Sequence, residues 1–167
     1  MSRKTGGSAI PSRFVIYRRS TGADAETLFS LTGDSVRRLA PDPYPPEVVA
    51  TWMTGRTPED YRPDCAEGKV WIAEADGVTL GFALGEPGEV KRLFVRADHA
   101  GRGLGQALME RALADARAAG DRLIRIEATL NAVAFYRRWG FAEVGRGVFP
   151  GREGLPPIAV VLLEARF

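Results

Sequence analysis

The chain has 167 residues, 45% of them hydrophobic and 26% charged, and its formal net charge is +2. This length and composition are those of a globular protein with one domain and a buried core. The weak charge argues against a nucleic-acid partner. No segment approaches the roughly 20 consecutive apolar residues that a membrane span requires.

The N-terminal residues and the cysteine content further restrict the kind of protein that this chain can be. Residues 1–12 are polar and basic, so we expect a flexible tail without a signal peptide, followed by a single domain over residues 13–167. Cys65 is the only cysteine, which excludes an internal disulfide and a cysteine-rich metal site. These features predict a cytoplasmic protein that holds no metal ion.

The first half of the chain is predicted to combine one strand with several helices. Residues 14–19 have the β-branched and aromatic content of a strand. Residues 22–40 have apolar side chains at helical spacing, and Gly33 is expected to split this helix into two pieces. In the proline-rich stretch that follows, short helices are expected to begin at Pro46 and Pro58, where the missing N–H of proline does no harm.

The second half of the chain alternates strands with helices. Asp76-Gly77 separates two apolar segments and is a strong signal for a β-hairpin. The expected elements are, in order, strands over residues 69–75, 78–85 and 88–95, a helix over 103–119, a strand over 121–128, a short helix over 131–139, and strands over 141–149 and 158–166. This order predicts an α/β fold with a mixed, mostly antiparallel sheet and helices on both faces.

Three glycines alternate in the loop HAGRGLGQ, just before the long predicted helix. A strand, a glycine-rich turn and a helix N-terminus together present free backbone N–H groups, which attract phosphate. Two common phosphate loops do not fit, because Gln106 stands where the dinucleotide motif needs glycine and no Gly-Lys-Ser/Thr follows. Taken alone, the glycines indicate either a phosphate site or only a tight turn.

Two longer stretches carry a resemblance to a known family. VKRLFVRADHAGRGLGQALMERAL is similar to the cofactor-binding motif of the GCN5-related N-acetyltransferase (GNAT) superfamily, a strand followed by an R/Q-x-x-G-x-G/A loop and a helix. NAVAFYRRWGFAEVG resembles that family's second signature, an aromatic–Tyr pair followed by Gly-Phe. The order of elements agrees over residues 13–165. The chain departs from the first motif at Ala100, where the family usually has Arg or Gln.

The resemblance implies acetyl-coenzyme A as co-substrate, without a metal. It implies that the pyrophosphate lies on the loop and that the pantetheine arm pairs with the preceding strand, beside a gap where this strand and residues 123–128 separate. The implied contacts are Leu93, Phe94 and Val95 from the strand and Gly101, Arg102, Gly103, Leu104, Gly105 and Gln106 from the loop. Asn131 is either a further cofactor contact or the N-cap of the short helix.

The resemblance also implies two catalytic groups. Tyr136 is the candidate acid that protonates the leaving thiolate, and its alternative role is that of a core aromatic residue. Glu89 is the candidate base because it shares strand parity with Leu93, although a glutamate on a strand is more often solvated or paired, here with Lys91. Glu74 and Glu127 are weaker candidates. His99 is expected on the surface, with a cofactor contact as the alternative.

These features predict an N-acetyltransferase that moves an acetyl group directly from the thioester to a primary amine of a small molecule. The alternatives are a protein N-terminal or lysine acceptor, or a catalytically silent acyl-coenzyme A sensor. The resemblance places acceptor specificity in residues 44–62 and 150–157, whose aromatic side chains, Trp52 among them, either wall a pocket or pack in the core. An exposed edge strand near the C-terminus makes a homodimer possible.

Overall fold

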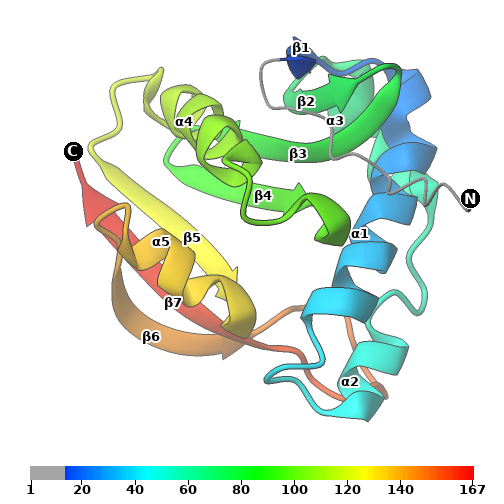
Figure 1. Cartoon of the computed structure of the whole chain (residues 1–167). Coiled ribbons are helices and arrows are strands. Elements are labelled where there is room, and N and C mark those ends of the chain that lie inside the picture. Colours follow the sequence, from blue (N-terminus) through cyan, green and yellow to red (C-terminus); the bar gives the residue numbers. More distant parts are fainter. Residues whose placement is uncertain (1–13) are drawn as a thin grey trace, which may run out of the picture.

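One twisted sheet organises residues 14–167, the part of the chain that this computed structural model describes (Figure 1). The tail expected over residues 1–12 lies outside the described residues. The strands are β1 (Ile16–Arg19), β2 (Val70–Ala75), β3 (Val78–Glu86), β4 (Glu89–Val95), β5 (Leu123–Thr129), β6 (Ala142–Val148) and β7 (Ala159–Arg166). Their order is β1-β2-β3-β4-β5-β7-β6, and among these strands only β4 and β5 pair in parallel.

Helices cover both faces of the sheet, so the predicted fold class is confirmed. The helices are α1 (Ala25–Leu39), α2 (Pro46–Thr51), α3 (Arg62–Ala66), α4 (Leu104–Arg117) and α5 (Val133–Arg137). One core cluster joins α4 and α5 to the sheet, and a second joins α1 and α3 to β2 and β3. A third cluster lies beyond the strand ends, where α1 and α2 meet the β6–β7 connection.

Helix α4 packs unusually close to β3 because two glycines leave room for it. Leu104, Leu108 and Ala112 form an apolar stripe along the helix and are fully or almost fully buried. A Cβ atom at Gly85 would collide with the Ala112 carbonyl oxygen, and one at Gly81 would lie 3.0 Å from the Leu108 side chain. This close approach sets the position of the loop that precedes α4.

Three sequence predictions about the helices need correction. Helix α1 continues through Gly33 without the expected break, because Gly33 is buried in the packed face of the helix. The α-helix α3 follows the 3₁₀ turn at Pro58 (Pro58–Asp60) and was not expected as an element of its own. The short helix expected over 131–139 is a 3₁₀ turn, η5 (Leu130–Ala132), followed by α5.

Replacement of Gly85 by alanine is expected to destabilise the fold by about 3 kcal/mol, because the added methyl group has no space against α4. For a chain of this length, that corresponds to a fall in Tm of roughly 6–12 °C in a thermal melt. Gly145→Ala is the control, since a Cβ atom there would lie 3.5 Å from Leu162, an ordinary contact. An equal Tm for the two variants would contradict the packing described above.

Candidate active site

A cavity of about 790 Å³ opens where β4 and β5 separate. The two strands meet only at the start of β4, where Glu89 is in register with Arg125 and the Arg125 N–H donates to the Gly88 carbonyl at 2.9 Å. Toward their carboxyl ends the strands part, as the family resemblance implied. The lining residues are Ser35, Val36, Leu39, Ala40, Trp52, Leu93, Phe94, Val95, Ala100, Gly101, Gly103, Gly105, Gln106, Thr129, Asn131, Ala132, Phe135, Tyr136, Arg138 and Trp139.

The glycine loop forms one end of this cavity. Gly101 (φ +77°) and Gly103 (φ +83°) adopt left-handed backbone conformations that favour glycine. Gly103 is the N-cap of α4, and neither a capping side chain nor an acidic residue in the first turn competes for the free amides there. The backbone N–H groups at this helix start are therefore available to an anion. Of the predicted loop contacts, Arg102 and Leu104 do not line the cavity, and Leu104 is buried in the core.

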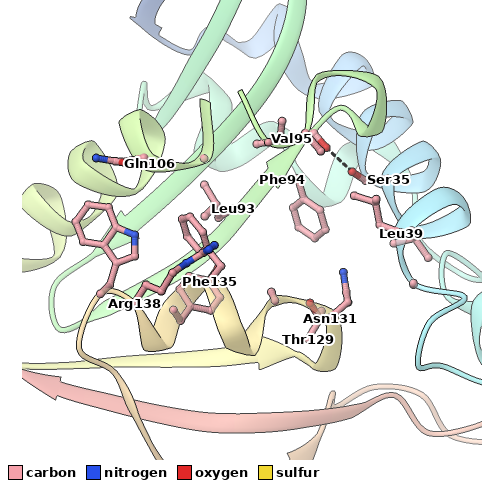
Figure 2. A pocket seen from close by; sticks show the side chains of 18 of the residues that line it. Ser35, Leu39, Leu93, Phe94, Val95, Gln106, Thr129, Asn131, Phe135 and Arg138 are labelled. Atoms are coloured by element: carbon pink, nitrogen blue, oxygen red, sulfur yellow. Dashed lines mark hydrogen bonds between the residues drawn. The ribbon is translucent and has the colours of Figure 1, made fainter. Parts of the chain in front are cut away.

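The end of β4 forms the floor between the two ends of the cavity (Figure 2). Leu93, Phe94 and Val95 all line it, so the structure brings the predicted strand contacts and loop glycines into one space. On its other edge β4 pairs along its length with β3. Ser35 of α1 donates a hydrogen bond from its Oγ to the Val95 carbonyl oxygen at 2.7 Å, which fixes α1 against the strand end.

Tyr136 reaches the same cavity from α5. Its ring is buried against Phe135 and Phe141, with centroids 5.3 and 6.4 Å away. Its hydroxyl has no hydrogen-bond partner within residues 14–167, although the residue lines the cavity. Burial raises the pKa of the Tyr136 hydroxyl well above its ordinary value. The side chain therefore remains a neutral phenol, able to donate a proton, throughout the physiological pH range.

Asn131 and Thr129 lie where β5 turns into α5, and both line the cavity. The alternative interpretation of Asn131 as a helix N-cap is wrong, because Thr129 is the N-cap of η5 and Ala132 that of α5. The exposed Asn131 side chain points toward the cavity instead (Figure 2). Its role as a cofactor contact stays a prediction.

The three candidate bases lie away from the cavity. Glu89 is at the paired end of β4, roughly 13 Å along the strand from Leu93 at about 3.3 Å per residue. Its expected partner Lys91 pairs with Glu86 instead, at 3.4 Å. Glu74 lies on β2 and pairs with Arg18 of the edge strand β1, with 3.1 Å between Oε1 and Nε. Glu127 is exposed on β5. Among the lining residues of the described chain there is no carboxylate.

His99 precedes the glycine loop but does not line the cavity. The predicted surface position holds only in part, since the residue is half-buried and its side chain is 13% exposed. Its Nδ1 lies 3.0 Å from an Asp98 carboxylate oxygen, and its Nε2 is buried without a partner in the described residues. The structure therefore gives His99 a place in the loop packing.

Several lining residues were not singled out in the sequence. Arg138 and Trp139 belong to the second motif, and Arg138 has no ion-pair partner in residues 14–167. Val36, Leu39 and Ala40 come from the end of α1, whose helical spacing indicates only a buried face. Trp52 is buried at 2% exposure and also lines the cavity, so it both packs in the core and walls the pocket.

Comparison with known proteins agrees with this geometry. The family model described as the acetyltransferase (GNAT) domain matches residues 40–151, about two thirds of the chain. The chain belongs to the GNAT family.

Within the described residues, no group of three His, Cys, Asp or Glu side chains is arranged to hold a metal ion. No helix in this part of the chain is long and apolar enough to cross a membrane.

Individual GNAT relatives are more distant. An IAA acetyltransferase of Azospirillum brasilense is 38% identical over 100 residues, a match that covers 54% of this chain and 63% of that protein. The match thus spans under two thirds of the relative's length. A GCN5-related N-acetyltransferase of Rhodopseudomonas palustris has a TM-score of 0.78 at 23% identity, over 96% of this chain and 100% of the other.

A second solved GNAT structure is that of the PaiA N-acetyltransferase of Thermoplasma acidophilum, in complex with coenzyme A. Its TM-score is 0.67 at 18% identity, over 92% of this chain and 99% of the other. At these identities the two solved structures show the fold that the chain shares with them.

The surroundings of Glu89 make its charge unfavourable. Burial raises the pKa of this carboxyl above its ordinary value of 4.5, and repulsion from Glu127 and Glu86 adds to the rise, while Lys91 and Arg125 lower it. An acid whose pKa is higher in the folded than in the unfolded protein destabilises the fold once it ionises. The protein therefore loses stability as the pH rises from the ordinary carboxyl pKa of 4.5 through the higher pKa of Glu89 in the folded state.

Glu89→Gln is expected to raise the Tm of this GNAT protein at pH 7–8 by about 1–3 °C, because the half-buried charge is removed. The gain should vanish below about pH 4.3, where the carboxyl is protonated in both states. Thermal melts across this pH range measure the effect, with the exposed Glu153→Gln as control. A lower Tm for Glu89→Gln at pH 7 would show that the carboxylate has a stabilising partner.

Proposed function

We propose that this chain catalyses transfer of an acetyl group from acetyl-coenzyme A to the primary amine of a small molecule. The observation that carries the proposal is that the free helix-start amides behind Gly101 and Gly103 open into the same cavity as the unpaired hydroxyl of Tyr136, whose ring is buried. An anion site and a neutral proton donor thus lie in one space. The named activity of the Azospirillum relative supports an acetyl group as the group transferred.

The loop end of the cavity fits the pyrophosphate of coenzyme A. The start of α4 offers backbone donors and the positive end of the helix dipole, with no acidic side chain in the first turn. Gln106 and Arg138 line this end of the cavity and supply further donors (Figure 2). The edge of β4 that faces away from β3, at Leu93–Val95, is open for pairing with an extended ligand such as the pantetheine arm.

In this proposal two groups of the chain act on the reacting atoms. The backbone N–H groups at the end of β4 stabilise the charge that builds on the carbonyl oxygen. Tyr136 gives its hydroxyl proton to the sulfur as the carbon–sulfur bond breaks, and solvent restores that proton. When bound, the thioester supplies the activated acetyl group. The amine nitrogen forms the new bond to the acetyl carbon and loses one proton.

The proton lost by the amine needs an acceptor, and the position of Glu89 does not suit it to this role. Because the described lining residues include no carboxylate, we assign proton removal to solvent water that enters through the open cavity. The neutral amine is then the form that attacks. A rise of kcat/KM with pH, up to the pKa of the amine used, is the expected signature of this assignment.

Gly103→Glu is expected to weaken binding of acetyl-coenzyme A about 100-fold or more, because a carboxylate at the helix start repels the phosphates. Isothermal titration calorimetry measures the dissociation constant. Gly77→Glu is the matched control, since Gly77 also has a positive φ (+76°) and open space around it but lies in the β2–β3 turn. Equal affinities of the two variants would contradict a phosphate site at the loop.

Tyr136→Phe is expected to lower kcat about 100-fold, because the variant has no proton for the leaving sulfur. Affinity for acetyl-coenzyme A should change less than about threefold, since the ring that packs in the core is kept. Tyr17→Phe, on β1 and beside Arg111, makes the same chemical change outside the cavity and is the control. Unchanged turnover in Tyr136→Phe would remove this residue from the reaction.

A further inference from the structure

The cavity has two chemically different ends. Gln106 and Arg138 lie at the end formed by the glycine loop and α5, and Leu39 of α1 lies at the other, with Phe94 between them (Figure 2). The end that faces away from the loop has an apolar wall made of Val36, Leu39, Ala40, Trp52 and Phe94. Two polar lining residues, Thr129 and Asn131, lie beside this wall (Figure 2). If coenzyme A takes the loop end, this apolar end is what remains for the acceptor.

Two hydroxyl groups around the apolar end already have partners inside the protein. The Ser35 hydroxyl donates to the Val95 carbonyl oxygen at 2.7 Å. The Tyr44 hydroxyl donates to the Ala159 carbonyl oxygen at 2.6 Å and accepts from the Leu130 N–H at 2.9 Å. Among the described lining residues, Thr129 and Asn131 are then the polar side chains left at this end. An acceptor that needs hydrogen bonds along its whole length would leave part of them unpaired against the apolar wall, which is unfavourable.

The charged group of Arg152, near the apolar end, is also engaged. The Arg152 guanidinium donates to the carbonyl oxygens of Thr51 and Trp52, both at 3.1 Å, and to that of Pro156 at 2.9 Å. The terminal N–H groups of Arg152 are thus occupied and are not free for a substrate carboxylate. No carboxylate among the described lining residues is available to a second ammonium group. Neither an amino acid nor a polyamine finds a counter-charge here.

We propose that the acceptor is a primary amine with an apolar carbon skeleton, an alkylamine or an arylalkylamine. Its apolar part lies against Leu39, Phe94 and Trp52, and its nitrogen points toward the end of β4. This inference rests on the proposed function and names the substrate class for the same site. The bond changes are those given above: the nitrogen–acetyl bond forms, the carbon–sulfur bond breaks, water takes the amine proton and Tyr136 protonates the sulfur.

Two matched pairs of amines test the substrate class. Phenylalanine is 2-phenylethylamine with an added carboxylate, and 1,6-diaminohexane is hexylamine with a second amine. In each pair, kcat/KM from thiol release is expected to be at least about tenfold higher for the compound without the added charge. Calorimetric titration of the same amines into protein saturated with coenzyme A should give the same order of affinities.

The outcomes separate this inference from the function on which it rests. If acetyl-coenzyme A binds but the charged member of each pair, or a peptide with a free N-terminus, is the better substrate, the apolar acceptor is wrong and the acetyltransferase proposal stands. If acetyl-coenzyme A binds and neither apolar amine is turned over, the apolar acceptor is also wrong. If acetyl-coenzyme A does not bind, the proposed function itself fails.

A variant shows whether the apolar wall sets the preference. Leu39 is 39% exposed, so Leu39→Glu places a carboxylate at the cavity without disrupting the core. We expect kcat/KM for hexylamine to fall about tenfold and that for 1,6-diaminohexane to rise, with unchanged affinity for acetyl-coenzyme A. Val78→Glu, 43% exposed in the β2–β3 hairpin, is the control and should retain the preference of the unmodified protein. An unchanged preference in Leu39→Glu would overturn the proposal.

Discussion

The separation of β4 from β5 is the constraint on which the site depends. The two strands share one register pair at Glu89 and Arg125, yet the sheet does not come apart beyond it. Strand β4 is held along its length by β3, and β5 is held from Leu123 to Thr129 by β7. Each strand thus keeps one complete partner. The backbone groups on the two open edges are then left for side chains, water or a ligand.

Side chains from α1 and from the connection between α1 and α2 stabilise this open arrangement. Ser35 satisfies the carbonyl group of Val95 at the end of β4, and the Tyr44 hydroxyl bridges Leu130 at the end of β5 and Ala159 at the start of β7. Tyr44 also packs edge-on against Trp52, with ring centroids 4.9 Å apart. The segment that ties down both strand ends is therefore the segment that walls one end of the cavity. A change in its packing would alter the shape of the cavity and the spacing of the strands together.

Sequence reasoning predicted the parts of this site that local chemistry determines. The two apolar segments on either side of Asp76-Gly77 predicted the central hairpin, and the glycine loop and Tyr136 lie within short motifs. Strand parity placed Glu89 on a face of β4 but carried no information on its distance from the gap. Tertiary packing decided the rest: Gly33 stays helical because it is buried, and Leu39, at an ordinary core spacing, faces the cavity because of how α1 meets a strand that lies far along the chain.

Burial at the apolar side of the cavity also bears on how the proposed transfer proceeds without a nearby carboxylate base. Low-polarity surroundings disfavour the charged form of a group that lies in them. For Tyr136 this effect raises the pKa of the hydroxyl and keeps the proton that the proposed reaction needs. For a bound ammonium the same effect lowers the pKa and favours loss of the proton to water. One physical property of the lining thus prepares both the proton donor and the nucleophile, whereas a buried carboxylate beside the amine would stabilise the ammonium form and oppose its attack.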